Sequence, residues 1–278
     1  MLIDKILNNN VVLSHNDSDE EIILMGRGLA FQKKIGDQVD AQFIEKEFVL
    51  KDSLTGHQMA QVFNDVPSEE IDLAKKMIDL AEKELQVELS TSIYLTLTDH
   101  LHYAIKRMQE GIEIPNPLLL ETQRFYPKEF AIAEKGLALV SQELGIELPE
   151  SEAGFIAFHI VNSSQGNDNM QTTMQMTEIV RDILSLISRY FGKTFDNQSL
   201  NYQRIVTHLQ YFAQRYLKNE LSDEQDEFLF TLVQSKYPKS FQAVQRINEF
   251  LEKTYHQPIG QAEMIYLTIH IDRVVGET

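Results

Sequence analysis

The sequence predicts a small antiparallel β domain followed by two related all-α domains, each a helical bundle. Three observations lead to this fold class. Short apolar runs alternate with turn residues over the first 50 positions, apolar residues then recur every three or four positions, and the helical part carries the same features twice. With 278 residues, of which 43% are hydrophobic, the chain is long enough for two or three packed domains.

The β domain is predicted from its turns. Four Asn- or Gly-rich turns, at 8–10, 16–17, 26–28 and 36–37, separate apolar runs at 2–7, 11–13, 22–25, 29–31 and 43–50. Runs of this length with turns about every 8–12 residues are typical of a small antiparallel sheet. The next stretch, 51–65, is predicted to be a linker or a short connecting helix.

Helical spacing begins after Pro67. One apolar stripe consists of Ile71, Ala74, Ile78, Ala81 and Leu85, and a second runs from Ile93 through Leu97, Leu101 and Ala104 to Met108. Pro117, Pro127 and Pro149 punctuate three further helical stretches. A polar segment at 163–169 is predicted to be a linker, after which helical spacing resumes.

The helical part is duplicated. His100, Leu101, Tyr103 and Arg107 match His208, Leu209, Tyr211 and Arg215 at an offset of 108 residues. At an offset of 111, Tyr126-Pro127-Lys128 matches Tyr237-Pro238-Lys239, and Glu152 and His159 match Glu263 and His270. We therefore predict a β domain at 1–55, a linker at 56–65, and two homologous helical domains at 66–170 and 171–278.

Composition narrows the function. The formal charge is -17, which argues against a protein that binds nucleic acid through a broadly basic surface. The chain has no Cys, which excludes disulfides, thiol catalysis and thiolate metal sites. No apolar run is long enough to span a membrane and no signal peptide is visible, so we expect a cytoplasmic protein without membrane insertion.

Four of the eight histidines have a counterpart in the other helical copy: His100 with His208, and His159 with His270. Each lies on or beside an apolar stripe, where a buried, hydrogen-bonded histidine is the ordinary interpretation. Duplication weakens this interpretation only in part, because a duplicated core would also duplicate its core histidines.

Three chemical roles compete with that interpretation. A metal site could combine two histidines with Asp99, Glu152 or Asp272, but the sequence has no His-Glu-x-x-His motif. Acid–base catalysis lacks a companion nucleophile, because no Cys, Gly-x-Ser-x-Gly or phosphate-binding loop occurs. Phosphorylation fits better, since imidazole accepts phosphoryl groups near neutral pH and the added charge can switch domain association. We therefore expect a regulator without a cofactor, and not an enzyme.

Six segments together resemble a known family: 5–12 (KILNNNVV), 25–34 (MGRGLAFQKK), 44–48 (IEKEF), 97–100 (LTDH), 152–162 (EAGFIAFHIVN) and 267–271 (LTIHI). The chain resembles, along its whole length, the BglG/LicT/SacY family of bacterial transcriptional antiterminators, and most of all the β-glucoside-responsive members.

The resemblance implies an N-terminal RNA-binding domain that forms a homodimer, followed by two phosphotransferase-system regulation domains. It implies that the RNA-binding domain holds a leader-mRNA hairpin that overlaps a terminator, so that transcription continues. It also implies phosphorylation of His100, His159, His208 and His270. In similar proteins the phosphocarrier HPr modifies the second regulation domain and favours activity, whereas the sugar-specific enzyme II permease acts through the first domain and inhibits.

The resemblance favours RNA contacts by six residues: Lys5, Asn8, Asn10, Gly26, Arg27 and Phe31. Asparagine amides can pair with bases, glycine allows close backbone approach, arginine can clamp phosphate, and an exposed phenylalanine can stack on an unpaired base. Hairpin turns use the same Asn and Gly residues for structural reasons, and a core position is the alternative for Phe31. A different function, a DNA-binding transcriptional activator with the same regulation domains, would need a helix-turn-helix in place of the predicted strands.

Overall fold

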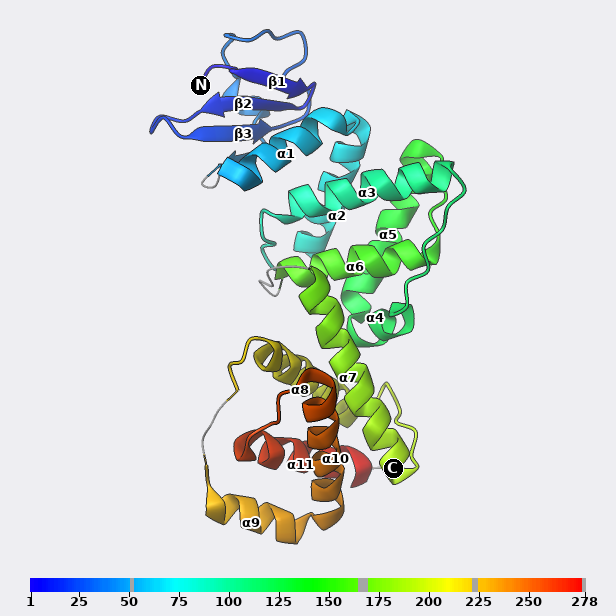
Figure 1. The fold of residues 1–278 in the computed structure, drawn as a ribbon. Coiled ribbons are helices and arrows are strands. Elements are labelled where there is room, and N and C mark those ends of the chain that lie inside the picture. The colour runs from blue at the N-terminus through cyan, green and yellow to red at the C-terminus, as the bar shows by residue number, and fades with distance from the viewer. Residues whose placement is uncertain (51–52, 165–169, 222–224, 277–278) are drawn as a thin grey trace. The chain divides into compact units, whose positions relative to one another are not determined.

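The structure is a computed structural model that describes residues 1–50, 53–164, 170–221 and 225–276 (Figure 1). It contains two compact units, one made of Met1–Leu119 with Tyr126–Asp168 and the other of Leu120–Phe125 with Asn169–Thr278. A four-stranded antiparallel sheet comes first and helices make up the rest, which confirms the predicted fold class. Within the described residues, no helix is both long enough and apolar enough to cross a membrane.

The sheet has the order β1-β2-β3-β4, and every neighbouring pair is antiparallel. Its strands are β1 (Lys5–Asn8), β2 (Val11–His15), β3 (Glu21–Met25) and β4 (Lys46–Val49). Four of the five apolar runs predicted as strands overlap these elements. The prediction of a strand at 29–31 is wrong. The amides of Leu29 and Ala30 bond the carbonyls of Gly26 and Asn9 within a loop, so the apolar side chains of this segment report burial and not strand pairing.

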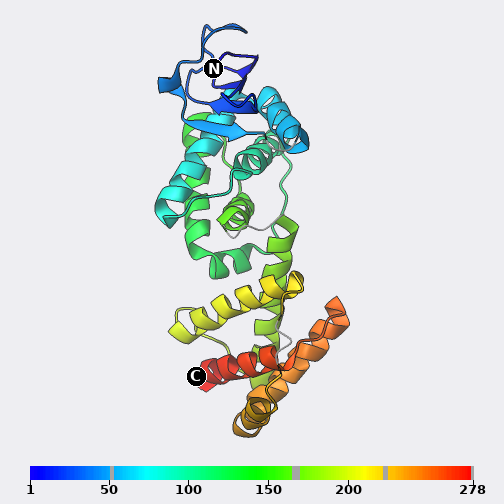
Figure 2. The same cartoon turned by 90° about the vertical axis from the view of Figure 1, so that its left-hand side faces the viewer.

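Both faces of the sheet are apolar because alternate residues point to opposite sides. One face packs against the domain's own loop through the buried residues Ile3, Val12, Ile22, Leu24, Leu29, Ala30 and Val39. The other face carries Leu7, Val11, Leu13, Ile23, Met25 and Phe48. Helix α1 (Ser53–Asp65) lies beside the sheet in both ribbon views (Figures 1 and 2), and its Met59 and Phe63 belong to the same buried cluster as the second face. The stretch after the sheet therefore takes the form of a connecting helix.

The helical bundle of the first unit contains α2 (Ser68–Leu85), α3 (Ile93–Gln109), α5 (Pro127–Leu144) and α6 (Glu150–Ser164). Helix α2 packs on α3 and α5, and α6 packs on the same two helices. The predicted stripe of α2 is the face that is buried, from Ile71 to Ala81. Pro67 occupies the N-cap position and Glu69 lies in the first turn, where a carboxylate is favoured by the helix dipole.

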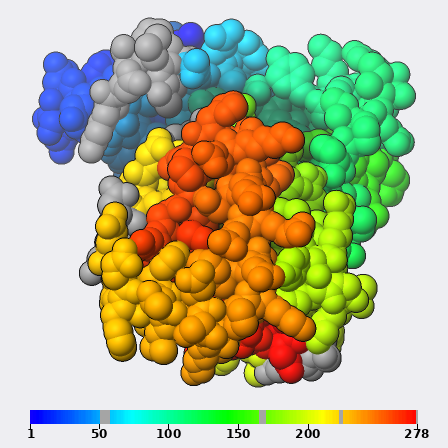
Figure 3. All heavy atoms as spheres, turned by 60° about the horizontal axis from the view of Figure 1, so that its bottom comes forward, coloured from blue at the N-terminus to red at the C-terminus, as the bar shows by residue number. Residues whose placement is uncertain are grey.

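The second unit contains α7 (Met170–Phe191), α8 (Leu200–Leu217), α9 (Glu227–Lys236), α10 (Pro238–Tyr255) and α11 (Gln261–Gly276). It also includes residues 120–125, which form most of α4 (Leu119–Phe125). Helix α10 packs on α7, α9 and α11, and α8 packs on α7 and α11. Atoms of α10, in orange, cross the middle of the face shown in Figure 3.

The duplication extends to the ends of the helices. Tyr126 and Tyr237 precede α5 and α10 with nearly the same backbone angles, φ -130° and -125° with ψ 54° in both, and proline follows each. Both helices also end on a left-handed residue, Gly145 with φ 68° in α5 and His256 with φ 60° in α10. Ser163 and Ser164, predicted to begin a linker, are the last residues of α6, and residues 165–169 lie outside the described residues.

Candidate functional site

Two turns of the sheet meet at one end of the β domain, and Asn8 and Asn10 hold them together. The Asn8 carboxamide oxygen accepts the Asn10 amide at 2.8 Å, which closes the turn between β1 and β2. The Asn10 carboxamide oxygen accepts the Gly28 amide at 2.7 Å, and its backbone carbonyl accepts the Gly26 amide at 2.9 Å. The oxygens of both asparagines are therefore engaged in the turns, whereas their amide NH₂ groups point outward from the domain.

Gly26 has a structural reason to be glycine. A Cβ at this position would lie 1.7 Å from the carbonyl oxygen of Phe43, a separation that no side chain can adopt. The close approach predicted for a ligand is thus made by the protein's own backbone. This contact fixes the loop that carries the two neighbouring candidates, Arg27 and Phe31.

The structure brings five of the six predicted RNA-binding residues to this end of the sheet and its following loop. Arg27 is exposed, and Phe31 is 63% exposed, which removes the alternative that Phe31 is a core residue. Lys5 is different. It pairs with Leu13 at the far end of β1 and lines a hollow with residues of α1, such as Gln61.

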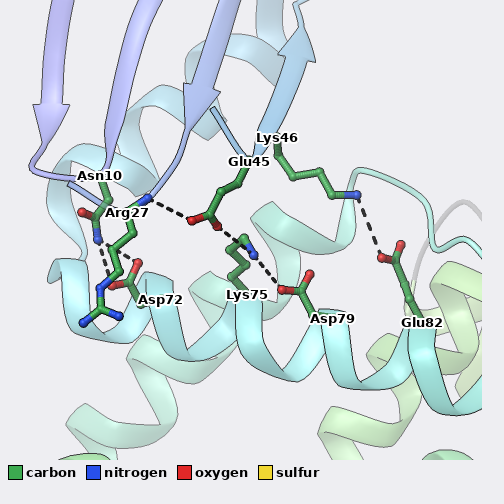
Figure 4. A network of polar contacts seen from close by, with 8 residues as sticks. All are labelled: Asn10, Arg27, Glu45, Lys46, Asp72, Lys75, Asp79 and Glu82. Atoms are coloured by element: carbon green, nitrogen blue, oxygen red, sulfur yellow. Dashed lines mark hydrogen bonds and ion pairs between the residues drawn. The ribbon is translucent and has the colours of Figure 1, made fainter. Parts of the chain in front are cut away.

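The amide groups of Asn8 and Asn10 contact the helices of the first unit. The Asn8 Nδ2 donates to the carbonyl of Phe63 in α1 at 2.7 Å. The Asn10 Nδ2 lies 2.8 Å from both carboxylate oxygens of Asp72 in α2. Figure 4 shows Arg27 beside the same carboxylate. Burial raises the pKa of Asp72, partly offset by Asn10 and by the positive charges of Lys76 and Arg27.

Ion pairs continue this contact along α2 (Figure 4). Glu45 of the β domain accepts the Arg27 amide at 3.3 Å and lies 3.0 Å from Lys75, which also pairs with Asp79 at 2.6 Å. Further along the helix, Lys46 lies 3.9 Å from Glu82. The β domain therefore contributes an acid to one ion pair and a base to the next, and α2 contributes the opposite charge in each.

The first pair of repeated histidines meets inside the first unit. The rings of His100 on α3 and His159 on α6 lie 5.0 Å apart between centroids. His100 Nε2 is 2.9 Å from a carboxylate oxygen of Glu152, although the two atoms do not satisfy hydrogen-bond geometry, so we describe the contact as electrostatic. The other oxygen of Glu152 accepts from Arg107 at 3.0 Å.

Glu152 is buried, with a side chain only 4% exposed. Burial alone would raise its pKa, but His100 and Arg107 together outweigh this and the pKa is lowered, so the carboxylate is ionised at neutral pH. Burial and the neighbouring His100 lower the pKa of His159 well below its ordinary value. A neutral imidazole with a free nitrogen is a nucleophile, so this pair has the chemistry of a phosphoryl acceptor.

The second pair has the same placement in the second unit but different partners. The rings of His208 on α8 and His270 on α11 are 3.9 Å apart. The Nδ1 of His208 hydrogen-bonds the hydroxyl of Tyr266, one turn before His270. Phe155 takes the place of Tyr266 in the first copy and has no hydroxyl to offer.

Glu263 pairs with Arg215 at 2.9 Å, repeating the pair of Glu152 with Arg107. Arg215 donates to both carboxylate oxygens of Glu263, but burial outweighs its charge and the pKa of Glu263 is raised. Burial, His208 and Arg273 lower the pKa of His270 to about 4. The sequence had identified these Arg and Glu residues as repeated, but not as neighbours of the histidines. The available signal was that Arg107 repeats at the same offset as His100, and Glu152 at the same offset as His159.

The histidine pairs lack the further ligands of a metal centre. Among the described residues, no group of three or more His, Asp or Glu side chains is arranged to hold a metal ion. His102, two residues from His100, points elsewhere and hydrogen-bonds Glu70 at 2.7 Å.

Comparison with known proteins assigns these sites to a family. Residues 1–55 match the CAT RNA binding domain, and residues 75–163 and 181–274 both match the PRD domain. The chain belongs to the BglG/LicT family of transcription antiterminators. It is 42% identical to the transcription antiterminator LicT of Bacillus subtilis, over the full length of both chains. It is 39% identical to the beta-glucoside operon antiterminator of Dickeya chrysanthemi, covering 98% of that protein.

A solved structure supports the fold of the first half. The crystal structure of GlcT CAT-PRDI superimposes with a TM-score of 0.54 at 35% identity, covering 59% of this chain and 97% of that one. The CAT and PRD modules of the family therefore correspond to the sheet and to the helical copies that contain the histidine pairs.

The lowered pKa of His270 predicts a pH-dependent stability of the second unit. A histidine whose pKa falls from 6.5 to about 4 on folding stabilises the protein fully above pH 6.5, and this contribution is lost as the pH falls towards 4. Because the group is partly exposed, we expect a loss of about 1–2 kcal/mol after allowing for solvent screening.

Chemical denaturation between pH 4 and 7 measures this loss. His270→Gln should flatten the pH dependence, and His256→Gln, which changes an exposed histidine, should not. The same slope in wild type and His270→Gln would contradict the assignment.

Proposed function

We propose that residues 1–55 bind a leader-mRNA hairpin that overlaps a terminator, and that phosphorylation of the histidine pairs controls this binding. The chain carries the RNA-binding module of an antiterminator family, and its full-length relatives include a beta-glucoside operon antiterminator. We infer that it controls a sugar operon of the same kind. The observation that carries the regulatory half is the recurrence, in two copies of one module, of a packed histidine pair together with a buried glutamate that pairs with an arginine.

The proposed RNA-binding surface would bind through aromatic stacking and a few local charges, and not through a broadly positive surface. Residues 1–55 contain six basic and ten acidic residues, so their total charge does not attract RNA. Arg27 can contact phosphate and the exposed ring of Phe31 can stack on an unpaired base, while Asn8 and Asn10 carry amide donors beside them. Recognition of a looped hairpin in this way relies on shape and stacking, and a homodimer would double the surface. Lys5, at the far end of β1, would contact only the flank of such a site.

The two histidine pairs present different nitrogen atoms to a phosphoryl donor. In His208, Nδ1 is occupied by Tyr266, so Nε2 is the nitrogen left to attack phosphorus. In His100, Nε2 faces the Glu152 carboxylate, which would repel an incoming phosphate. This difference suits two separate inputs. HPr would act on His208 and His270, and an enzyme II permease for β-glucosides would act through His100 and His159.

Transfer to His208 would form a bond from phosphorus to its Nε2 and break the bond from phosphorus to the donor imidazole of HPr. The attacking Nε2 carries no proton, because the proton of neutral His208 is on Nδ1 beside the Tyr266 hydroxyl. The donor imidazole, protonated on its other nitrogen, takes the electron pair of the broken bond and leaves as neutral imidazole. The product adds roughly two negative charges beside Arg204 and Arg273, whose charges already act on His208.

A DNA-binding activator with the same regulation domains remains the second candidate considered from the sequence. It would need a helix-turn-helix, whereas residues 1–50 consist of four strands, turns and one three-residue 3-10 segment at Ala41–Phe43. The structure and the CAT match both favour RNA.

Stacking by Phe31 gives the first prediction of this function. Phe31→Ala should weaken binding to the antiterminator hairpin by about 1–3 kcal/mol, which is roughly 5- to 150-fold in dissociation constant. Phe228→Ala removes another exposed ring, from the second unit, and should leave binding unchanged. Fluorescence anisotropy with a labelled hairpin measures both, and equal affinity of wild type and Phe31→Ala would remove Phe31 from the site.

Phosphorylation of the second pair gives the next prediction. Incubation with phosphoenolpyruvate, enzyme I and HPr should label His208 and His270, with the label on Nε2 of His208. Phosphorus and nitrogen NMR distinguish the two phosphohistidine isomers, and mass spectrometry maps the sites, with His256 as an internal control. Label that is absent from His208 and His270, or lies on Nδ1 of His208, would contradict the mechanism.

A further inference from the structure

The amide donors proposed to bind RNA are occupied within the chain. Asn8 donates to the α1 backbone, and Asn10 donates to both oxygens of Asp72 in α2. Asn10 is only 8% exposed as a result. A carboxylate that accepts from an asparagine amide and lies beside an arginine satisfies the same groups as a phosphate or a base edge would.

We infer that α2 of the first PRD domain is an internal competitor for RNA, so that the hairpin and Asp72 exclude one another at Asn10 and Arg27. This inference rests on the proposed RNA-binding face. It adds a second state of the same site, in which the first PRD domain closes over the turns and its acidic side chains take the place of the RNA.

The space that remains beside Arg27 is unsuited to RNA phosphates. A hollow of about 350 Å³ separates the loop at Gly26 and Arg27 from α2. It is lined by the acidic residues Glu45, Glu69, Asp72 and Glu143 and by the basic residues Arg27, Lys75 and Lys76. The acids outnumber the bases, so a phosphate backbone cannot enter this hollow favourably until α2 moves away.

Hydrogen bonds and ion pairs hold the closed arrangement, and each side of the boundary contributes both acidic and basic groups. Asp72 and Glu82 of α2 face Asn10 and Lys46 of the sheet, whereas Lys75 between them faces Glu45. Most of these groups are partly exposed, so each pair contributes modestly and the set acts by matching positions along the helix. The boundary also has an apolar part, because Phe48 of β4 packs on Tyr94 of α3 with ring centroids 5.0 Å apart, within a buried cluster that continues into α2. Displacement of α2 from Asn10 therefore has to break polar contacts and loosen this packing.

The closed state weakens RNA binding without abolishing it. Phe31 remains exposed and can make a first contact while α2 still covers Asn10 and lies beside Arg27. The apparent affinity then equals the intrinsic affinity multiplied by the open fraction of molecules. Any change that destabilises the contact with α2 should therefore increase the measured affinity.

Hairpin affinity of the full-length chain tests the inference. Asp72→Ala should tighten binding about three- to tenfold. Glu84→Ala is the matched control, because it removes the same charge from the same helix but contacts Lys135 and not the β domain. It should leave affinity within twofold of wild type. Circular dichroism and the melting temperature confirm that each variant is folded.

Lys75→Ala provides a second test, because the inference and simple electrostatics predict opposite changes in RNA affinity. Removing a positive charge would ordinarily weaken binding to RNA, yet loss of the contact with Glu45 should open the site and tighten binding. Affinities of Asp72→Ala and Lys75→Ala equal to or weaker than that of wild type would overturn the inference while leaving the RNA-binding function intact. If no variant and no wild-type protein binds the hairpin, the proposed function itself fails.

Discussion

The carboxamide of Asn10 connects the β domain, its RNA face and the first PRD domain. Its oxygen holds the Gly28 amide and so joins the two turns, while its nitrogen lies against Asp72. One end of the group is thus needed for folding of the loop that presents Arg27 and Phe31. The other end is available to a partner outside the domain. In the proposed competition, this nitrogen bonds either the α2 carboxylate, in the closed state, or a group of the RNA, in the bound state.

A second constraint is the buried glutamate, paired with an arginine, that each PRD copy repeats. A buried carboxylate needs a cation, and Arg107 and Arg215 provide it. In the first copy the same carboxylate also faces His100, whereas in the second copy Tyr266 has taken over the histidine contact. One replacement, phenylalanine by tyrosine, therefore changes which imidazole nitrogen is in contact with a neighbouring side chain in the two homologous modules.

The sequence predicted the parts of the fold that depend on local pattern. Strand and helix periods, the proline starts and the repeat were readable because each follows from spacing along the chain. The segment at Leu29 was misassigned because its apolarity reflects burial in a loop, which only tertiary contacts show. Likewise the sequence could match the histidines of one copy with those of the other, but it could not show that the two histidines within a copy are in contact. That contact depends on the packing of α3 against α6. The role of Asp72 was hidden for the same reason, because 62 residues separate it from Asn10.

Part of the net charge of -17 lies at this boundary. Acidic residues on α2 disfavour unspecific RNA at the site and supply the groups that close it.

The central claim is that RNA displaces α2, and a distance measurement tests it most directly. Since the chain has no cysteine, Ser18→Cys and Glu134→Cys place spin labels only on the β domain and α5, both at exposed positions. Labelled protein diluted with unlabelled chain would report distances within one molecule by electron paramagnetic resonance. We expect a single narrow distance distribution in the free protein and a shifted, broader distribution with the hairpin bound. An unchanged distribution at saturating hairpin would contradict the displacement of α2 by RNA.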